Sequence, residues 1–102
     1  MFNINTEYRK GVLFLRLQGR FDYNYYVSTI DKLVVKFGIK AVVLNLCELK
    51  HVSLENINYI NLLNKKILKK RIKLLICDKE IRNDLFRNIV KINSEIEAFS
   101  LI

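Results

Sequence analysis

Few side chains in this sequence are of the kinds that carry out chemistry. The chain holds one histidine, His51, and two cysteines, Cys47 and Cys77. Metal sites need several converging His, Cys or carboxylate groups, and nucleophilic centres need a Ser or Cys beside a base. Both cysteines end apolar runs, where a free thiol in a reducing compartment behaves as a small hydrophobe, so we expect both in the core. The sequence therefore predicts no metal site and no nucleophilic centre.

Motifs for phosphate binding and acid–base catalysis are also absent. The three glycines form no P-loop and no dinucleotide-binding series. The carboxylates Asp22, Glu48 and Glu55 stand far apart, and Asp78 occupies a predicted helix start, where an acid is favoured in any case. We therefore expect a protein that is not an enzyme and has no cofactor.

The elements that would position these residues begin with two strands and a helix. Residues 2–8 and 12–18 alternate apolar and polar side chains around a turn at 9–11, which predicts a β-hairpin. Apolar side chains from Tyr23 to Phe37 then follow the spacing of an amphipathic helix, with Asp22 able to cap its start.

A buried strand and a second helix follow. The apolar run Ala41–Leu46 predicts a central strand covered on both faces, and residues 47–52 are expected to form a loop that contains His51. Ser53 is the expected N-cap of a helix that runs to about Lys70, with an apolar stripe that begins at Leu54.

The last third of the chain predicts two strands separated by a helix. Residues 73–77 form a short buried strand, and Asp78 caps a helix that carries Ile81, Leu85 and Ile89. Residues 96–101 are expected to form the last strand.

The predicted order is β-β-α-β-α-β-α-β, an open α/β sandwich with a mixed, mostly parallel sheet and an antiparallel N-terminal hairpin. With 102 residues and no internal linker, residues 1–102 are expected to form a single domain. Residues that should be buried together in its core are Leu15, Ile30, Leu33, Val43, Leu44, Ile60, Leu63, Leu75 and Leu85.

The chain is strongly basic. Eighteen Lys and Arg against ten Asp and Glu give a formal charge of +8. Six cations form a basic patch near the end of the second predicted helix: Lys65, Lys66, Lys69, Lys70, Arg71 and Lys73. Three interpretations stay open, namely a solvated helix end that complements the helix dipole, a surface for an acidic protein, and a nucleic-acid site, which lacks the usual interleaved aromatics.

Two short motifs and the spacing between them resemble the STAS domain, a family of anti-sigma factor antagonists and related modules of sulfate transporters. The motifs are Gly19-Arg20-Phe21-Asp22 before the first helix and Val42-Val43-Leu44-Asn45-Leu46 before the second, and Leu85-Phe86 also fits the pattern. The resemblance covers about residues 1 to 100. It implies a partner protein, such as an anti-sigma factor or a Ser/Thr kinase-type regulator.

This sequence departs from the phosphorylatable members of that family at the start of the second helix. Where they carry Asp-Ser-Ser-Gly, with the second Ser as phosphoacceptor, this chain has Ser53-Leu54-Glu55-Asn56. Glu55 then stands at the acceptor position, or Ser53 lies nearest to it if the register slips by one residue. Glu55 is either a permanent, partial imitation of a phosphoserine or an ordinary acid in a first helical turn.

The sequence and the resemblance together predict a non-enzymatic protein-interaction module. Residues expected to contact the partner are Phe21, Asp22, Tyr25, His51, Ser53, Leu54, Glu55 and Asn56. His51 is either a solvated loop residue or an interface contact. The alternatives are an accessory subunit of a membrane transport complex and a basic nucleic-acid-binding domain.

The hydrophobic pattern also bears on location. The longest apolar runs fall far short of the ~20 residues that span a bilayer, and residues 1–9 lack a secretory signal pattern. We therefore expect no membrane insertion and a cytoplasmic location.

Overall fold

The chain opens with the β-hairpin. The computed structural model describes residues 3–20, 38–78, 86 and 88–102. Strands β1 (Asn3–Arg9) and β2 (Val12–Arg20) pair antiparallel, from Asn3 opposite Gln18 to Arg9 opposite Val12. Lys10 and Gly11 form the turn, with φ of 51° and 85°. Positive φ at both turn residues lets a two-residue turn match the right-handed twist of the strands that it joins.

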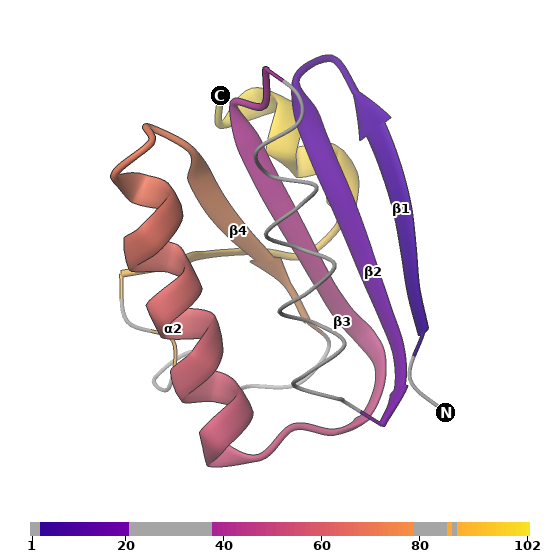
Figure 1. Cartoon of the computed structure of the whole chain (residues 1–102). Coiled ribbons are helices and arrows are strands. Elements are labelled where there is room, and N and C mark those ends of the chain that lie inside the picture. The colour runs from indigo at the N-terminus through magenta and orange to yellow at the C-terminus, as the bar shows by residue number, and fades with distance from the viewer. Residues whose placement is uncertain (1–2, 21–37, 79–85, 87) are drawn as a thin grey trace.

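The hairpin forms one edge of a five-stranded sheet with the order β1-β2-β3-β4-β5 (Figure 1). The remaining strands are β3 (Ala41–His51), β4 (Lys73–Cys77) and β5 (Val90–Ile92). Neighbouring strands from β2 to β5 are parallel. The predicted mixed sheet with an antiparallel N-terminal hairpin is therefore confirmed.

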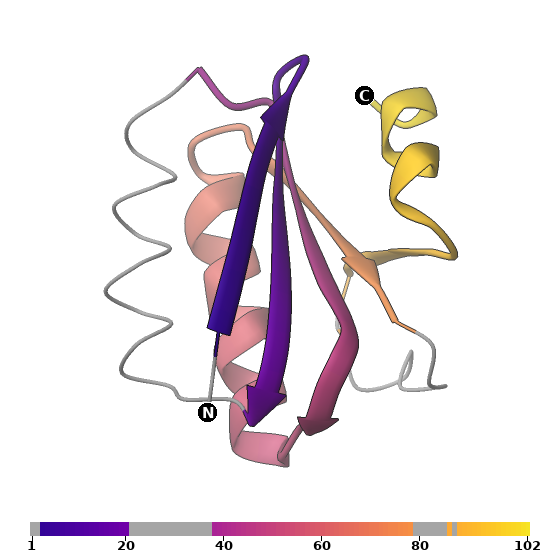
Figure 2. The same cartoon turned by 90° about the vertical axis from the view of Figure 1, so that its right-hand side faces the viewer.

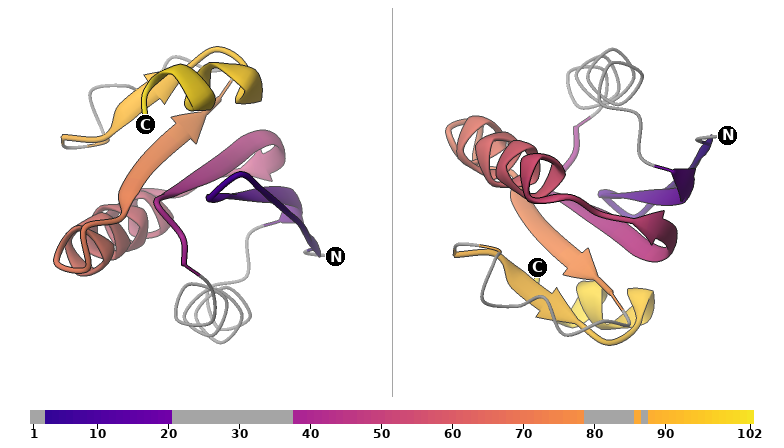
Figure 3. Two further views of the ribbon diagram at one scale, coloured as in Figure 1. Left: turned by 90° about the horizontal axis from the view of Figure 1, so that it is seen from above. Right: turned by 90° about the horizontal axis from the view of Figure 1, so that it is seen from below.

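Helical elements lie on both faces of this sheet. The α-helix α2 (Leu54–Leu68) packs on one face, and the 3₁₀ helix η2 (Glu95–Ser100) lies on the other (Figure 3). Among the residues described, α2 is the one α-helix, and its buried positions recur every three or four residues: Ile57, Ile60, Leu63, Asn64 and Ile67.

The sheet separates two apolar clusters, so the predicted single core is wrong in part. Leu15, Leu44, Ile60 and Leu63 pack together on the α2 face, as expected. Because successive strand residues point to opposite faces, Val43 and Leu75 pack instead on the η2 face. Leu44, with no exposed surface, sits at the centre of the first cluster.

Three predicted boundaries are corrected. The expected loop 47–52 is wrong, because β3 continues through these positions to His51, alongside β2. The expected last strand at 96–101 is also wrong, since η2 covers residues 96–100 and β5 forms the sheet edge at Val90–Ile92. Ile89 immediately precedes β5 and is not helical.

Several predictions fall outside the residues that the structure describes. They are the first helix at 23–37 with its core residues Ile30 and Leu33, the cap Asp22, and the helix positions Ile81 and Leu85.

Candidate functional site

The carboxyl ends of β2 and β3 and the start of α2 lie together at one end of the molecule. The two strands are parallel neighbours, and Arg20 pairs with His51 at their ends. Only Val52 and Ser53 separate His51 from the first helical residue, Leu54. Figure 2 shows the arrowheads of β2 and β3 beside the first turn of α2. The carboxyl edge of parallel strands is where α/β proteins most often bind ligands.

Ser53 caps α2 as the sequence predicts. It has extended backbone angles, and its Oγ accepts a hydrogen bond from the backbone N–H of Asn56 at 3.2 Å. The carbonyl of Ser53 accepts the first helical bond, from the N–H of Ile57 at 3.0 Å. The hydroxyl therefore stabilises the helix start, a contribution of about 0.5–2 kcal/mol.

Leu54 and Glu55 form the exposed surface of the first helical turn. Leu54 is 66 % exposed, and the buried stripe of α2 begins at Ile57 rather than at Leu54. Leu68, the last residue of α2, is exposed as well. The exposed Glu55 places a negative charge at the positive end of the helix dipole, which stabilises α2 by ~0.3–1 kcal/mol. An apolar and an anionic side chain thus stand side by side in solvent.

The other predicted contact residues are placed only in part. Asn56 is half-buried, and His51 ends β3 instead of lying in a loop. Phe21, Asp22 and Tyr25 lie outside the described residues.

The basic patch lies at the opposite end of α2. Lys65 and Lys66 belong to its last turn. Lys69, Lys70 and Arg71 form the turn that follows, and Lys73 begins β4. All six side chains are exposed. The structure therefore does not join the basic patch to the start of α2.

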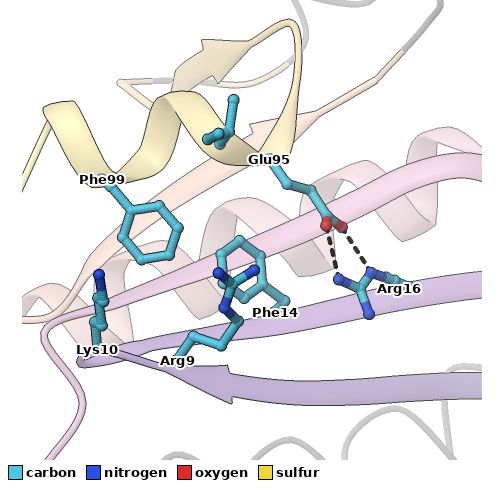
Figure 4. A pocket seen from close by; sticks show the side chains of 7 residues that line it. Arg9, Lys10, Phe14, Arg16, Glu95 and Phe99 are labelled. Atoms are coloured by element: carbon cyan, nitrogen blue, oxygen red, sulfur yellow. Dashed lines mark hydrogen bonds and ion pairs between the residues drawn. The ribbon is translucent and has the colours of Figure 1, made fainter.

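A polar cluster on the η2 face was not anticipated from the sequence. Arg16 of β2 donates to Glu95 through two nitrogens, at 2.9 and 2.8 Å (Figure 4). It also donates to Glu7 at 2.9 Å. Asn45 also donates to Glu95, at 2.9 Å. The hydrogen bonds from Arg16 lower the pKa of Glu95, and Glu95 in turn raises the pKa of Arg16. The cluster ties the C-terminal segment to the sheet.

One signal for this cluster was present in the sequence. Arg16 and Asn45 are the polar residues within the apolar runs 12–17 and 41–46, and the structure places them opposite one another in the β2–β3 register. Such a pair needs a polar partner on its face of the sheet. Nothing local points to Glu95, which is 79 residues from Arg16.

A pocket of about 410 Å³ opens beside this cluster (Figure 4). Its described lining residues are Arg9, Lys10, Phe14, Arg16, Glu95, Ile96 and Phe99. The Arg9 guanidinium lies 5.7 Å from the centre of the Phe99 ring, and Phe14 packs against the same ring. This lining offers positive charge and apolar surface, without a nucleophile or an acid–base pair.

The cysteines differ in burial. Cys77 is buried as predicted, whereas Cys47 is half-buried and directs its Sγ toward the carbonyl oxygen of Cys77 at 3.9 Å. Burial, reinforced by Cys47, raises the pKa of Cys77 to about 12. Cys77 therefore stays a protonated thiol at neutral pH, which makes it a poor nucleophile.

The described ranges contain neither a cluster of metal ligands nor a membrane-spanning helix. Within residues 3–20, 38–78, 86 and 88–102, no three His, Cys, Asp or Glu side chains gather as metal ligands would. In the same part of the chain, no helix has the length and apolar character needed to cross a bilayer.

Solved structures of other proteins are similar to this fold. No protein-family model and no curated protein matches the sequence. The crystal structure of an anti-sigma factor antagonist from Mycobacterium paratuberculosis matches 100 % of this chain and 94 % of its own, with a TM-score of 0.80 and 14 % identity. The anti-sigma factor antagonist SpoIIAA in its unphosphorylated form matches over 99 % of this chain and 96 % of its own, with a TM-score of 0.77 and 11 % identity.

A third solved structure, that of Mglu, is similar over 76 % of this chain and 20 % of its own, with a TM-score of 0.63 and 23 % identity. The two antagonists, in contrast, match over nearly the whole length of both chains. This chain therefore has the fold of the anti-sigma factor antagonists, the STAS fold.

Proposed function

We propose that this protein is a non-enzymatic, cytoplasmic interaction module that binds an anti-sigma factor or a related Ser/Thr kinase-type regulator. The observation that carries the proposal is the exposed Leu54–Glu55 pair at the start of α2, set at the carboxyl edge of β2 and β3 in a STAS fold. An exposed leucine beside a fixed charge offers a partner both apolar area and orientation.

Glu55 determines whether the proposed module can be switched by phosphorylation. In the register that the resemblance implies, Glu55 stands where phosphorylatable relatives carry the acceptor serine. A carboxylate carries about one negative charge, whereas a phosphoserine carries −1.5 to −2, so Glu55 imitates the phosphorylated state in part. Because a Ser/Thr kinase phosphorylates a hydroxyl and Glu55 has none, the proposed module binds its partner without a phosphorylation switch at this position.

The contact surface is proposed to extend beyond the first turn of α2. His51 and Asn56 flank that turn in the chain, and Phe21, Asp22 and Tyr25 follow β2, whose carboxyl end lies beside that of β3. Ser53 contributes through its cap, which fixes the direction of Leu54 and Glu55.

The test is site-specific photocrosslinking in the native cell. A photoreactive phenylalanine analogue replaces Leu54 in one strain and Leu62 in another. Leu62 is a matched control because it lies on the same helix, two turns further on, and is 61 % exposed. We expect an adduct with an anti-sigma factor or kinase-type regulator from position 54 and none from position 62. Equal adducts from both positions, or none from position 54, would contradict the proposal.

One observation favours a second candidate, an accessory subunit of a membrane transport complex. Such a subunit needs no phosphoacceptor, and Glu55 provides none. The same crosslinking experiment separates the two, since position 54 would then capture a transport ATPase or permease. The genes beside this one give an independent indication, a sigma factor or kinase for the first candidate and a transporter for the second.

A further inference from the structure

Cations from four separate segments meet at the end of the sheet opposite the start of α2. They come from the β1–β2 turn, the residue before β3, the turn after α2 and the first position of β4. We call this surface the cationic end, made of Lys10, Lys40, Lys69, Lys70, Arg71 and Lys73. Figures 1 and 2 both show these segments together at the top of the molecule. Lys10 and Lys40 are far in sequence from the basic patch that the helix end predicts.

Backbone hydrogen bonds hold these segments side by side. The N–H of Lys40 donates to the carbonyl of Gly11 at 2.8 Å, and the N–H of Lys73 donates to the carbonyl of Lys40 at 3.1 Å. The Nζ of Lys73 donates to the carbonyl of Leu101 at 3.0 Å, which brings the C-terminal segment to the same end. The cationic end is therefore a feature of the folded sheet.

None of the ion pairs found among the described residues offsets the charge of this end. All six side chains are exposed, and in the described part of the chain the ion pairs involve Arg9 and Arg16 but none of the six. Glu48, near the carboxyl end of β3, and Glu55, in the first turn of α2, lie toward the opposite end. The molecule is 30 Å long, several times the Debye length of about 8 Å at physiological salt, so these distant acids do not cancel the local field.

Exposed aliphatic side chains accompany the cations. Leu68 ends α2 beside the turn at 69–71, and Leu101 and Ile102 lie next to Lys73, all three with large exposed surfaces. A surface that combines lysines with exposed aliphatic groups suits the boundary between lipid headgroups and acyl chains. Five of the six cations are lysines, which lack the planar, bidentate geometry by which arginine contacts nucleic acid. The two rings that line a pocket with Lys10, Phe14 and Phe99, are buried or half-buried and offer little free face on which bases could stack.

We propose that the cationic end docks on an anionic lipid surface, with Leu68, Leu101 and Ile102 entering the headgroup region and no segment crossing the bilayer. The helix α2 has 15 residues and is therefore about 22 Å long. Its start faces away from the lipid in this orientation, so the Leu54–Glu55 surface stays accessible to a protein. Lipid docking is independent of which partner binds there.

Vesicle binding tests the proposal. The full chain is titrated with phosphatidylcholine vesicles, with and without 30 mol % phosphatidylglycerol, and the bound fraction is measured by flotation. We expect binding to the anionic vesicles alone, weakening as salt rises. The double variants Lys10→Gln/Lys40→Gln and Lys69→Gln/Lys70→Gln should each bind on the order of 25-fold more weakly, at roughly fivefold per cation.

A charge-matched control removes two cations from the other end of the molecule. Arg20→Gln/Lys50→Gln lowers the net charge by the same amount and should reduce vesicle binding less than threefold, since both residues lie near the carboxyl ends of β2 and β3. Thermal melting followed by circular dichroism checks that every variant is folded. An equal loss in the control would show that net charge, not the cationic end, is responsible, and would overturn the proposal.

A nucleic acid is the competing occupant. Fluorescence anisotropy with a labelled 20-nucleotide single strand and a 20-base-pair duplex measures its affinity directly. The variant Leu101→Ser should weaken vesicle binding severalfold, because it removes an aliphatic contact that lipid alone can use. Tight binding of either oligonucleotide with no binding to anionic vesicles would overturn the lipid assignment.

Discussion

The Arg16–Glu95 ion pair makes the stability of this protein depend on pH in a defined way. Arg16 donates two hydrogen bonds to Glu95 and Asn45 donates a third, while the Glu95 side chain is 24 % exposed. A hydrogen bond to a charged group contributes about 1.5–3 kcal/mol, and partial solvent screening reduces this. Since Arg16 keeps Glu7 as a partner, we expect Glu95→Gln to cost about 1–2 kcal/mol at pH 7.

The sign of the pH dependence follows from the lowered pKa of Glu95. When the pKa of a carboxylate is lower in the folded than in the unfolded state, its ionised form stabilises the fold. This stabilisation is present at a pH above the ordinary pKa of the group, which for Glu95 is 4.5. That stabilisation disappears as the pH falls through the folded pKa. The difference in unfolding free energy between wild type and Glu95→Gln should therefore be constant above about pH 5 and shrink at lower pH.

Urea denaturation followed by circular dichroism, repeated from pH 7 to pH 2.5, measures this difference. Glu97→Gln is the matched control, because Glu97 lies on the same 3₁₀ helix and its carboxylate, within the described residues, accepts a single hydrogen bond, from the backbone N–H of Asn93 at 3.3 Å. The control should change stability by less than about 0.5 kcal/mol. A difference for Glu95→Gln that stays constant down to pH 2.5, or no difference at pH 7, would refute the role given to the ion pair.

Three other predictions address the core, the helix cap and phosphorylation. Leu44→Ala should lower the unfolding free energy by ~2–5 kcal/mol in the same urea assay, with exposed Leu62→Ala as the near-neutral control. Ser53→Ala should cost about 0.5–2 kcal/mol, because the N–H of Asn56 loses its side-chain acceptor, whereas Ser53→Asp should restore the cap. Incubation with a cognate kinase and ATP should leave residues 50–58 unmodified in a mass spectrum, and phosphate on Ser53 would contradict the register that places Glu55 at the acceptor position.

Local patterns in the sequence predict the elements whose stability is decided locally. The alternation around Lys10–Gly11 gives the hairpin, and Ser53 with the stripe from Ile57 gives α2, because a cap and an apolar period act within a few residues. The strand at 73–77 is confirmed at both ends for the same reason.

The C-terminal segment could not be predicted in this way. Residues 95–100 form a 3₁₀ helix because Ala98 and Phe99 pack on the η2 face of the sheet and Glu95 reaches Arg16. These contacts come from four strands, the most distant of which, β2, holds Arg16, 79 residues before Glu95. The candidate site likewise has a part that the sequence predicts and a part that it does not. The cap at Ser53 depends on local residues, whereas the exposure of Leu54 depends on how α2 packs on the sheet.

The separation of charge along the molecule has a source in the topology. A helix that joins two parallel strands starts at their carboxyl edge and ends at their amino edge, so its dipole favours acids at one end and bases at the other. Glu55 in the first turn of α2 and Lys65 and Lys66 in its last turn follow this rule.

Helix dipoles do not account for the whole cationic end. Lys10 lies in a β-turn and Lys40 in the connection before β3, outside any helix that the structure describes. Their presence beside the end of α2 adds positive charge where no described helix requires it. This excess distinguishes a binding surface from a solvated helix end, and the variant Lys10→Gln/Lys40→Gln tests it without altering α2.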